Sequence, residues 1–353
     1  MTVTTVASAN NVQQWDEAFD REWQRADQFA RYTGKSVNAI IQVKEKLMSL
    51  PGDQLTQSLV TRLTGTPTTG DNTLHGNEEA IGNYGYKHTV DQFRHAVTMG
   101  HAEQKKTHLD MLKIATPLLK DWIVAYHRDQ IIAALYVMNT DGATRYAPTS
   151  EANKDTAYAA NSDRVLMGVD PDHYSGDHSA DLLKITATTD DFDPEALSIM
   201  KRLAKLSDPH IRPVRVNGQG EFYVAFAPSY TFRDFKTSAS QLAAHQYAAS
   251  RGKGNPLFTD TSLYWDGCVV EEVPEIDALE NVGASSIDVG LVSLCGAQTI
   301  GYAVGERAKS EKDDWDYHNE KGVSIGEISV VNLLTFNSKF HGVVKGYFPC
   351  EAD

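Results

Sequence analysis

Apolar residues in the first part of the chain recur with the period of a helix. Over residues 12–32, Trp15, Phe19 and Trp23 lie four positions apart, with charged residues between them. This spacing predicts an amphipathic helix that ends near Gly34. The pattern fits a core helix of a compact domain, and it also fits an arm whose aromatic residues pack on a neighbouring subunit.

The longest helical pattern covers residues 102–137. Pro117 interrupts it, which predicts either a kink or the first turn of a second helix. A helix of about 30 residues is about 45 Å long, which suits a structural spine better than an enzyme domain. The apolar positions that share one face are Leu109, Leu112, Leu119, Ile123 and Tyr126.

Strand patterns dominate the second half, so the fold class is α+β. A helix with Asp193 as its N-cap and Pro194 at its first position separates a polar, irregular stretch at 139–192 from strands that begin near Ile211. Alternating residues around a turn at 217–220 predict one hairpin, and Asp266 and Gly267 mark the turn of another. Residues 288–304 return to a helical pattern, whereas 322–336 and 340–348 are predicted to be paired strands.

Residues 59–98 combine many glycines and threonines with few large apolar residues. Strand-like runs at 59–63 and 84–90 flank a turn-rich tip. Long loops are uncommon in compact domains unless they are functional or disordered, and an isolated hairpin is marginal in water. The segment is therefore predicted to project as a hairpin and to gain order by docking on a neighbour; a flexible active-site lid is the alternative.

The composition is that of a globular protein. The 353 residues, 41% of them hydrophobic, are enough for two lobes or one large elaborated domain. No stretch is apolar enough to span a bilayer, and the N-terminus lacks the features of a secretory signal. A net charge of −14 without a basic cluster argues against tight binding of nucleic acid. The three widely spaced cysteines predict buried, reduced thiols.

Each candidate for catalysis or metal binding is weak. His127, Arg128 and Asp129 match a kinase tripeptide, but they lie inside a predicted helix and no phosphate loop accompanies them. Residues 170–181 begin and end like a calcium loop, yet the required glycine is one place late. The adjacent carboxylates of Glu78 and Glu79 would point to opposite faces of a strand, which does not suit paired acid–base catalysis. We therefore predict no catalytic residue, cofactor site or metal site.

The segment at residues 70–100 resembles one branch of the tailed-bacteriophage major capsid proteins, found in certain short-tailed phages. Its core runs from Gly70 to Glu79 and is followed at the expected interval by Asp91, Arg94, Ala96 and Val97. Further similar segments follow in the family's order, at 118–122, 222–236, 255–270, 294–305 and 314–326. The resemblance covers nearly the whole chain and is weakest over 139–192.

This resemblance implies the tailed-phage major capsid (Johnson) fold, with an N-terminal arm, an extended β-hairpin loop, a peripheral domain around a long spine helix, and an axial domain. The expected boundaries are 1–55 for the arm and 56–98 for the extended loop. The peripheral domain takes 99–207, with a polar insertion at 139–192, and is completed by return strands at 306–353. The axial domain takes 208–305.

The resemblance also implies a function: self-assembly through hexamers and pentamers into the icosahedral shell that encloses the double-stranded DNA of the phage. The expected partners are other copies of the chain, a separate scaffolding protein, a portal protein and DNA held without specific binding, with no membrane. Assembly would take place in the host cytoplasm. The expected subunit-interface residues are Trp15, Phe19, Trp23, Leu74, Asn77, Glu78, Tyr84 and Tyr86.

Two other functions compete with this interpretation. A cellular nanocompartment of the same fold would enclose an enzyme instead of DNA, and a soluble enzyme with a glycine-rich lid would be a stable monomer or dimer. Covalent cross-linking through Lys87, which lies in the loop region where some relatives cross-link, is not expected, because no acceptor or catalytic acid is apparent in the sequence.

Overall fold

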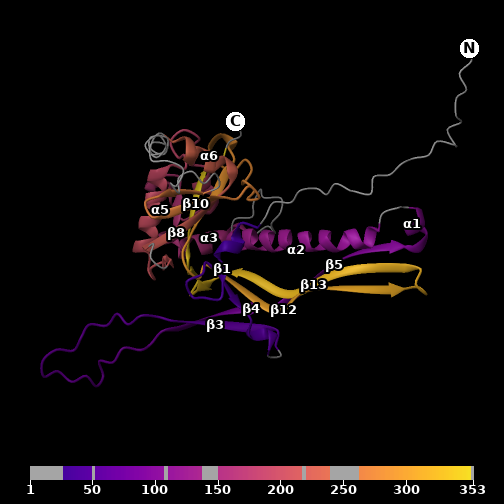
Figure 1. Ribbon diagram of the computed structural model, residues 1–353. Helices are drawn as coiled ribbons and strands as arrows, with labels where there is room; N and C mark the ends of the chain where they lie inside the picture. The colour runs from indigo at the N-terminus through magenta and orange to yellow at the C-terminus, as the bar shows by residue number, and fades with distance from the viewer. Residues whose placement is uncertain are drawn as a thin grey trace, which may run out of the picture. The chain divides into compact units, whose positions relative to one another are not determined.

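The computed structural model describes residues 27–49, 52–106, 110–136, 150–216, 220–238 and 262–350 (Figure 1). The chain divides into two compact units. The first consists of Met1–Asp27, Gln92–Tyr126 and Arg307–Glu327, and the second of Gln28–Asp91, His127–Glu306 and Ile328–Asp353. Most of the helix predicted at 12–32 lies outside the described residues; its end is a short 3-10 helix at Phe29–Tyr32.

The first unit packs a helix on a twisted group of strands. Its helices are α1 (His101–Lys106) and the first part of α2 (Met111–Leu135). Its strands are β5 (Asp91–Gly100) and the adjoining ends of β12 (Ile300–Trp315) and β13 (Glu320–Leu333), in the order β12-β13-β5. The long predicted helix is thus confirmed in outline, although Pro117 lies inside α2 and does not begin a helix. The core is formed by Leu119, Ile123, Val323 and Ile325.

The second unit is built on a large mixed sheet in the order β6-β16-β11-β8-β10-β9, with β7 paired to β8. These strands are β6 (Val165–Met167), β7 (Val214–Val216), β8 (Gly220–Ala227), β9 (Ser262–Trp265), β10 (Cys268–Glu272), β11 (Val289–Cys295) and β16 (Val343–Pro349). In the same unit, β12 pairs in parallel with β2 (Ile41–Lys44), and β2 with β1 (Thr33–Gly34).

One prediction about these strands was wrong, and another was only partly confirmed. Residues 288–304 form β11 and the start of β12, not a helix. Every residue of β11 is buried, so the strand shows none of the alternation that distinguishes a strand from a buried helix. The strands predicted at 322–336 and 340–348 exist, but they pair with each other only at their adjoining ends, where β14 (Thr335–Phe336) pairs with β15 (Lys339–Phe340). Their longer parts pair elsewhere: β13 with β12 and β5, and β16 with β11 and β6. The hairpins around 217–220 and around Asp266 and Gly267 are confirmed.

The large sheet is buried on both faces. Along β8, Val224 and Phe226 belong to one apolar cluster, and Tyr223, Ala225 and Ala227 to a second. Phe226 is 1% exposed, and its ring lies 4.9 Å from that of Phe29. Helices α5 (Pro194–Leu206) and α6 (Ser229–Thr237) contribute Leu197, Met200, Phe232 and Phe235 to the second cluster.

Local capping signals correctly placed the start of α5. The Asp193 carboxylate accepts a hydrogen bond from the Ala196 backbone N–H at 2.8 Å, and Pro194 occupies the first position. The same chemistry operates in the stretch predicted to be irregular, and that prediction was wrong. Residues 151–182 contain α3 (Glu151–Ala160) and α4 (His178–Leu182). Asp177 caps α4, which explains one of the acidic residues that resembled a calcium loop.

The cysteines Cys268, Cys295 and Cys350 are free and buried, as predicted. Burial raises the pKa of each thiol to about 12. Among the residues that the structure describes, no helix has the length and apolar character needed to cross a bilayer.

Candidate assembly interface

A two-stranded hairpin in the second unit carries most of the predicted interface residues. Strands β3 (Gln54–Val60) and β4 (Asn83–Thr89) pair antiparallel. In this register Leu55 lies opposite His88, Gln57 opposite Tyr86, and Leu59 opposite Tyr84. Because side chains alternate along a strand, these six share one face of the hairpin. The hairpin expected from the sequence is therefore confirmed. Strand β4 matches the predicted run at 84–90, whereas β3 lies mostly before the predicted run at 59–63.

The root of the hairpin is fixed on the body of the unit by His88. Its side chain is fully buried, although it comes from a strand whose other residues are mostly exposed. The imidazole packs so closely on Gly301 of β12 that a Cβ there would lie 2.4 Å from its Cε1 atom. Tyr86 lies edge-on to the imidazole at 5.0 Å, and Gln57 donates a hydrogen bond to Gln42 of β2 at 3.3 Å.

Burial determines the charge state of His88. Neither ring nitrogen has a hydrogen-bond partner among the described residues. Desolvation, reinforced by the positive charge of Lys44, lowers the pKa of His88 to about 4. The imidazole is therefore neutral at pH 7 and packs as an uncharged ring between the hairpin and the sheet.

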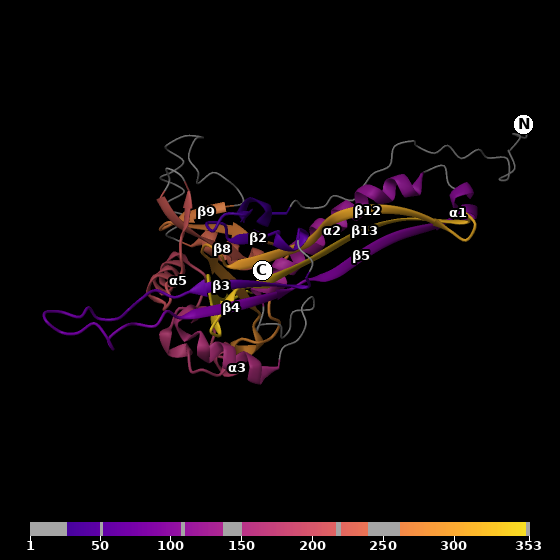
Figure 2. The same cartoon turned by 90° about the horizontal axis from the view of Figure 1, so that it is seen from below.

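Beyond the two strands, residues 61–82 continue as a long loop without regular secondary structure (Figures 1 and 2). Four large apolar side chains on and beside this loop are more than half exposed. They are Val60 at 63%, Leu63 at 62%, Leu74 at 64% and Ile81 at 67%. Exposed apolar side chains gathered on one segment indicate a surface that another molecule covers.

The loop has internal order although its side chains are exposed. The Glu79 carboxylate accepts hydrogen bonds from the backbone N–H groups of Thr64 at 2.7 Å and Gly65 at 2.6 Å. These donors hold the pKa of Glu79 below its usual value. Closer to the strands, Thr61 N–H donates to the Gly82 carbonyl at 3.0 Å. The two sides of the loop are thus joined at two levels.

The interface residues expected from the sequence occupy different environments. Leu74 lies at the exposed tip, where Asn77 donates to the Thr73 carbonyl at 2.8 Å and Glu78 accepts from Gly76 N–H at 2.7 Å. Tyr84 is 38% exposed on β4, and Tyr86 is partly buried beside His88. Trp15, Phe19 and Trp23 lie outside the described residues.

Sequence reasoning missed Glu79 and His88. Glu78 and Glu79 do not form a catalytic pair, because each carboxylate is bound to different backbone donors. The sequence offered one weak signal for Glu79: a carboxylate two residues after Asn77, facing a glycine-rich segment. No local signal marked His88, because its burial depends on Gly301, which lies far along the chain.

A groove lies between the base of the loop and the body of the same unit. Its wall on the loop side includes Leu59, Val60 and Tyr84, and its other wall includes Pro209 and Phe336. The cavity volume is about 600 Å³. Arg62 spans the gap and pairs with Asp208 at 3.4 Å, with both side chains mostly exposed.

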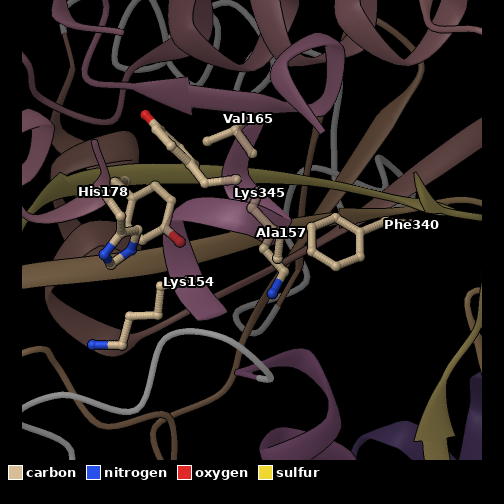
Figure 3. Close-up of a pocket in the computed structure, with 8 residues that line it drawn as sticks. Lys154, Ala157, Val165, His178, Phe340 and Lys345 are labelled. Atoms are coloured by element: carbon tan, nitrogen blue, oxygen red, sulfur yellow. The ribbon is translucent and has the colours of Figure 1, made fainter. Parts of the chain in front are cut away.

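A second cavity, of about 10 Å³, has the chemistry but not the size of an active site (Figure 3). Lys154, His178, Lys345 and Phe340 line it from different elements. Burial lowers the pKa of Lys345 to about 7, and its ammonium lies 4.7 Å from the Phe340 ring centre. Lys154 pairs with Glu151 at 3.1 Å. The space is about that of one water molecule, so it cannot admit a substrate.

The described residues contain no group of His, Cys, Asp or Glu that could hold a metal ion. The carboxylates of Asp170, Asp177 and Asp181 accept hydrogen bonds from protein donors. Asp181 is fully buried and accepts hydrogen bonds from Ser175 N–H at 2.6 Å and from Lys184 at 2.8 Å.

Comparison with known proteins connects this geometry to one class. A family model described as phage capsid protein matches residues 3–346. The major capsid protein of Pseudomonas phage KPP25 is 26% identical over 346 residues, which cover 92% of this chain and 90% of the relative.

Solved capsid structures give the same result. The chain is similar to one in the capsid asymmetric unit of cyanophage Pam1, with a TM-score of 0.91 and 32% identity over 100% of both chains. It is also similar to a chain in the capsid of Ralstonia phage GP4, with a TM-score of 0.76 and 23% identity over 99% of both chains. The latter similarity concerns the fold alone.

Proposed function

The chain belongs to the phage capsid protein family, and from this premise we propose that it is the major capsid protein of a tailed bacteriophage. Copies of it would assemble into the icosahedral shell that encloses the double-stranded DNA genome, and the protein would be part of the virion. The observation that carries this proposal is the hairpin of β3 and β4, whose loop exposes large apolar side chains in the single copy.

A closed shell requires repeated contacts between copies of one chain, and such contacts are made by complementary surfaces without catalytic groups. The loop supplies one such surface. Leu63, Leu74 and Ile81 are apolar and exposed, and they lie on a segment that is already ordered. A preordered segment binds with a smaller entropic cost than a disordered one.

We propose Leu74, Asn77, Glu78, Tyr84 and Tyr86 as contacts with a second copy, together with Trp15, Phe19 and Trp23 of the arm. Tyr86 is the weakest of these candidates because part of its ring already packs on His88. The arm, extended loop, peripheral domain and axial domain keep their proposed boundaries at 1–55, 56–98, 99–207 with 306–353, and 208–305. The two compact units divide the chain differently, because each gathers segments from distant parts of the sequence.

The other partners belong to the same proposal. A separate scaffolding protein would guide assembly, a portal protein would occupy a special position in the shell, and the packaged DNA would be held without specific binding. The net charge of −14 supports this last point, since an acidic chain has no electrostatic attraction for phosphates. Assembly would take place in the host cytoplasm.

We also propose that the chain has no enzymatic activity. The strongest chemical candidate is the cluster around Lys345, where a fully buried amine has a pKa of about 7. Its cavity of about 10 Å³ admits no substrate. The His178 ring packs on Tyr347, and the Lys345 amine lies over the Phe340 ring. These groups therefore serve to pack α3 and α4 against β16.

Electron microscopy of the purified protein tests the proposal, with and without a crowding agent. Shells, tubes or sheets are expected, and shells made during infection should contain double-stranded DNA. Shells that contain an enzyme would indicate a nanocompartment instead. A stable monomer or dimer that never assembles, even with the phage's own scaffolding protein, would contradict the proposal.

A pair of loop variants sharpens this test. Leu74→Asp places a charge in the proposed apolar contact and should abolish assembly, because burying an unpaired carboxylate is costly. Thr73→Asp adds the same charge next to it, at a residue that is also exposed and polar. It should assemble far better than Leu74→Asp. Equal assembly by the two variants would remove Leu74 from the interface.

A further inference from the structure

The loop between β3 and β4 contains an internal contact that an interface does not by itself require. Residues 61–82 lack regular secondary structure, yet their two sides are joined at Glu79. The Glu79 carboxylate accepts three hydrogen bonds. These come from Thr64 N–H at 2.7 Å, Thr64 Oγ1 at 3.3 Å and Gly65 N–H at 2.6 Å.

The donors and the acceptor are far apart in sequence for a loop contact. Thr64 and Glu79 are 15 residues apart, and Gly65 and Glu79 are 14 apart. The contact therefore closes a smaller ring, residues 66–78, inside the longer loop. Leu74 lies in this ring. A shorter closed loop has fewer conformations to lose when it binds.

Gly65 is suited to this contact by its lack of a side chain. A Cβ at Gly65 would lie 2.8 Å from Glu79 Oε2, closer than real Cβ atoms approach an oxygen. The glycine thus lets the carboxylate reach the backbone N–H of residue 65 directly. Both oxygens of Glu79 are used, one by Thr64 and the other by Gly65.

We propose that Glu79 is a positioning residue for assembly, whose carboxylate closes the loop tip and holds Leu74 ready to dock before a second copy is met. This inference rests on the proposed function. Glu79 itself acts through the loop that it shapes and need not touch the neighbouring copy. The two backbone donors require an acceptor at both carboxylate oxygens, so a carboxamide cannot replace it: its NH₂ group would face an N–H donor.

The test compares Glu79→Gln with Asp71→Asn in the full-length protein. The two variants lose the same charge in the same loop. Asp71 is exposed, and it is not among the proposed contacts with a second copy. Two quantities are measured: hydrogen exchange of the loop amides in the unassembled subunit, and the protein concentration at which shells first form.

For Glu79→Gln we expect exchange at Thr64 and Gly65 to rise roughly fivefold or more and the threshold concentration for assembly to rise by a similar factor. The shells that form above that threshold should be normal, because the change affects the unbound subunit. Asp71→Asn should resemble the unsubstituted protein in both measurements.

Unchanged hydrogen exchange in Glu79→Gln would overturn the inference, because the Glu79 contact would then not hold the loop. Faster hydrogen exchange with an unchanged threshold concentration would overturn it as well, because the Glu79 contact would then have no effect on assembly. A threshold raised equally in both variants would assign the effect to lost charge and also overturn it. Failure of the unsubstituted protein to assemble under every condition would instead contradict the proposed function, and this inference with it.

Discussion

The large sheet of the second unit and the hairpin of β3 and β4 use their side chains in opposite ways. In the sheet, β11 and β16 are buried at every position, with apolar clusters on both faces. In the hairpin, one strand face is turned to the body and the other residues are exposed. The sheet is stabilised by contacts within one chain, whereas the hairpin leaves much of its apolar surface uncovered.

This contrast separates folding from assembly within one molecule. A substitution in the sheet should change the free energy of unfolding of the single subunit. A substitution in the loop should leave that free energy unchanged and alter contacts between copies. Substitutions at the hairpin root, His88 and Gly301, should affect both the free energy of unfolding and assembly, because the root attaches the loop to the folded body.

The largest expected effect comes from the sheet. Phe226→Ala removes a ring that is 1% exposed and contacts Phe29 and Tyr32. Such truncations cost about 3–5 kcal/mol. Chemical denaturation of the unassembled subunit measures this, with Leu74→Ala, at a 64% exposed position, as the matched control. Equal losses for the two variants would remove the distinction between the regions.

The hairpin root should show a smaller effect that is specific to one contact. Gly301→Ala inserts a methyl group where a Cβ would lie 2.4 Å from His88 Cε1 and 3.0 Å from Leu334 Cδ2. Overpacking of this kind costs about 1–3 kcal/mol. In the double variant with His88→Ala, the added methyl meets a cavity, so the two losses should be less than additive. Simple additivity in denaturation experiments would show that the two residues are not in contact.

The same root should respond to pH. The pKa of His88 falls from 6.5 to about 4 on folding, because the buried ring lies near Lys44 and has no acceptor among the described residues. The unfolded chain therefore binds more protons between these values. The stability that His88 contributes is complete above pH 6.5 and is lost as the pH falls towards 4. The full loss is about 3 kcal/mol, because each pH unit between the two pKa values contributes about 1.4 kcal/mol.

Hydrogen exchange of β3 and β4 amides at pH 7 and pH 5 measures this locally. A local measurement is needed because His178 and His341 also have pKa values lowered to about 4 by burial. His88→Leu, which keeps an apolar side chain at the root, should make hairpin exchange independent of this titration after correction for intrinsic rates. An unchanged pH response in His88→Leu would assign the effect to another group.

The smallest effect is expected at the surface ion pair beside the loop. Arg62 and Asp208 pair at 3.4 Å with side chains that are 59% and 79% exposed. Exposed pairs contribute about 0–1 kcal/mol and are screened by salt. Arg62→Ala should therefore change the free energy of unfolding by less than about 0.5 kcal/mol. A larger, salt-sensitive loss would mean that this pair, and not His88, fixes the base of the loop.

Features determined by neighbouring residues were predictable from the sequence. Asp193 and Pro194 marked the start of α5 because capping depends on residues within one turn. Strand β4 was recognisable from its local pattern, whereas β3 lies mostly before the strand predicted at 59–63. The resemblance to capsid proteins then gave the fold, because its motifs follow one another in the same order along the chain.

Features that depend on distant partners were not predictable in this way. The buried strand β11 was read as a helix, because a strand covered on both faces has no alternation of apolar and polar residues. The sequence places Glu79 beside Glu78 and so suggests only a carboxylate pair, whereas the hydrogen-bond partners of Glu79 lie across the loop. His88 is one of several scattered histidines in the sequence, and its burial depends on Gly301, which lies on a strand far along the chain.

The buried thiols have a practical consequence. The chain has three cysteines, all are buried, and burial raises the pKa of each to about 12. Maleimides react with the exposed thiolate, so the native particle should be inert to them. One cysteine introduced at an exposed residue away from the loop between β3 and β4 would then be the reactive position in every copy. A dye or peptide attached there would be displayed with the spacing of the lattice itself.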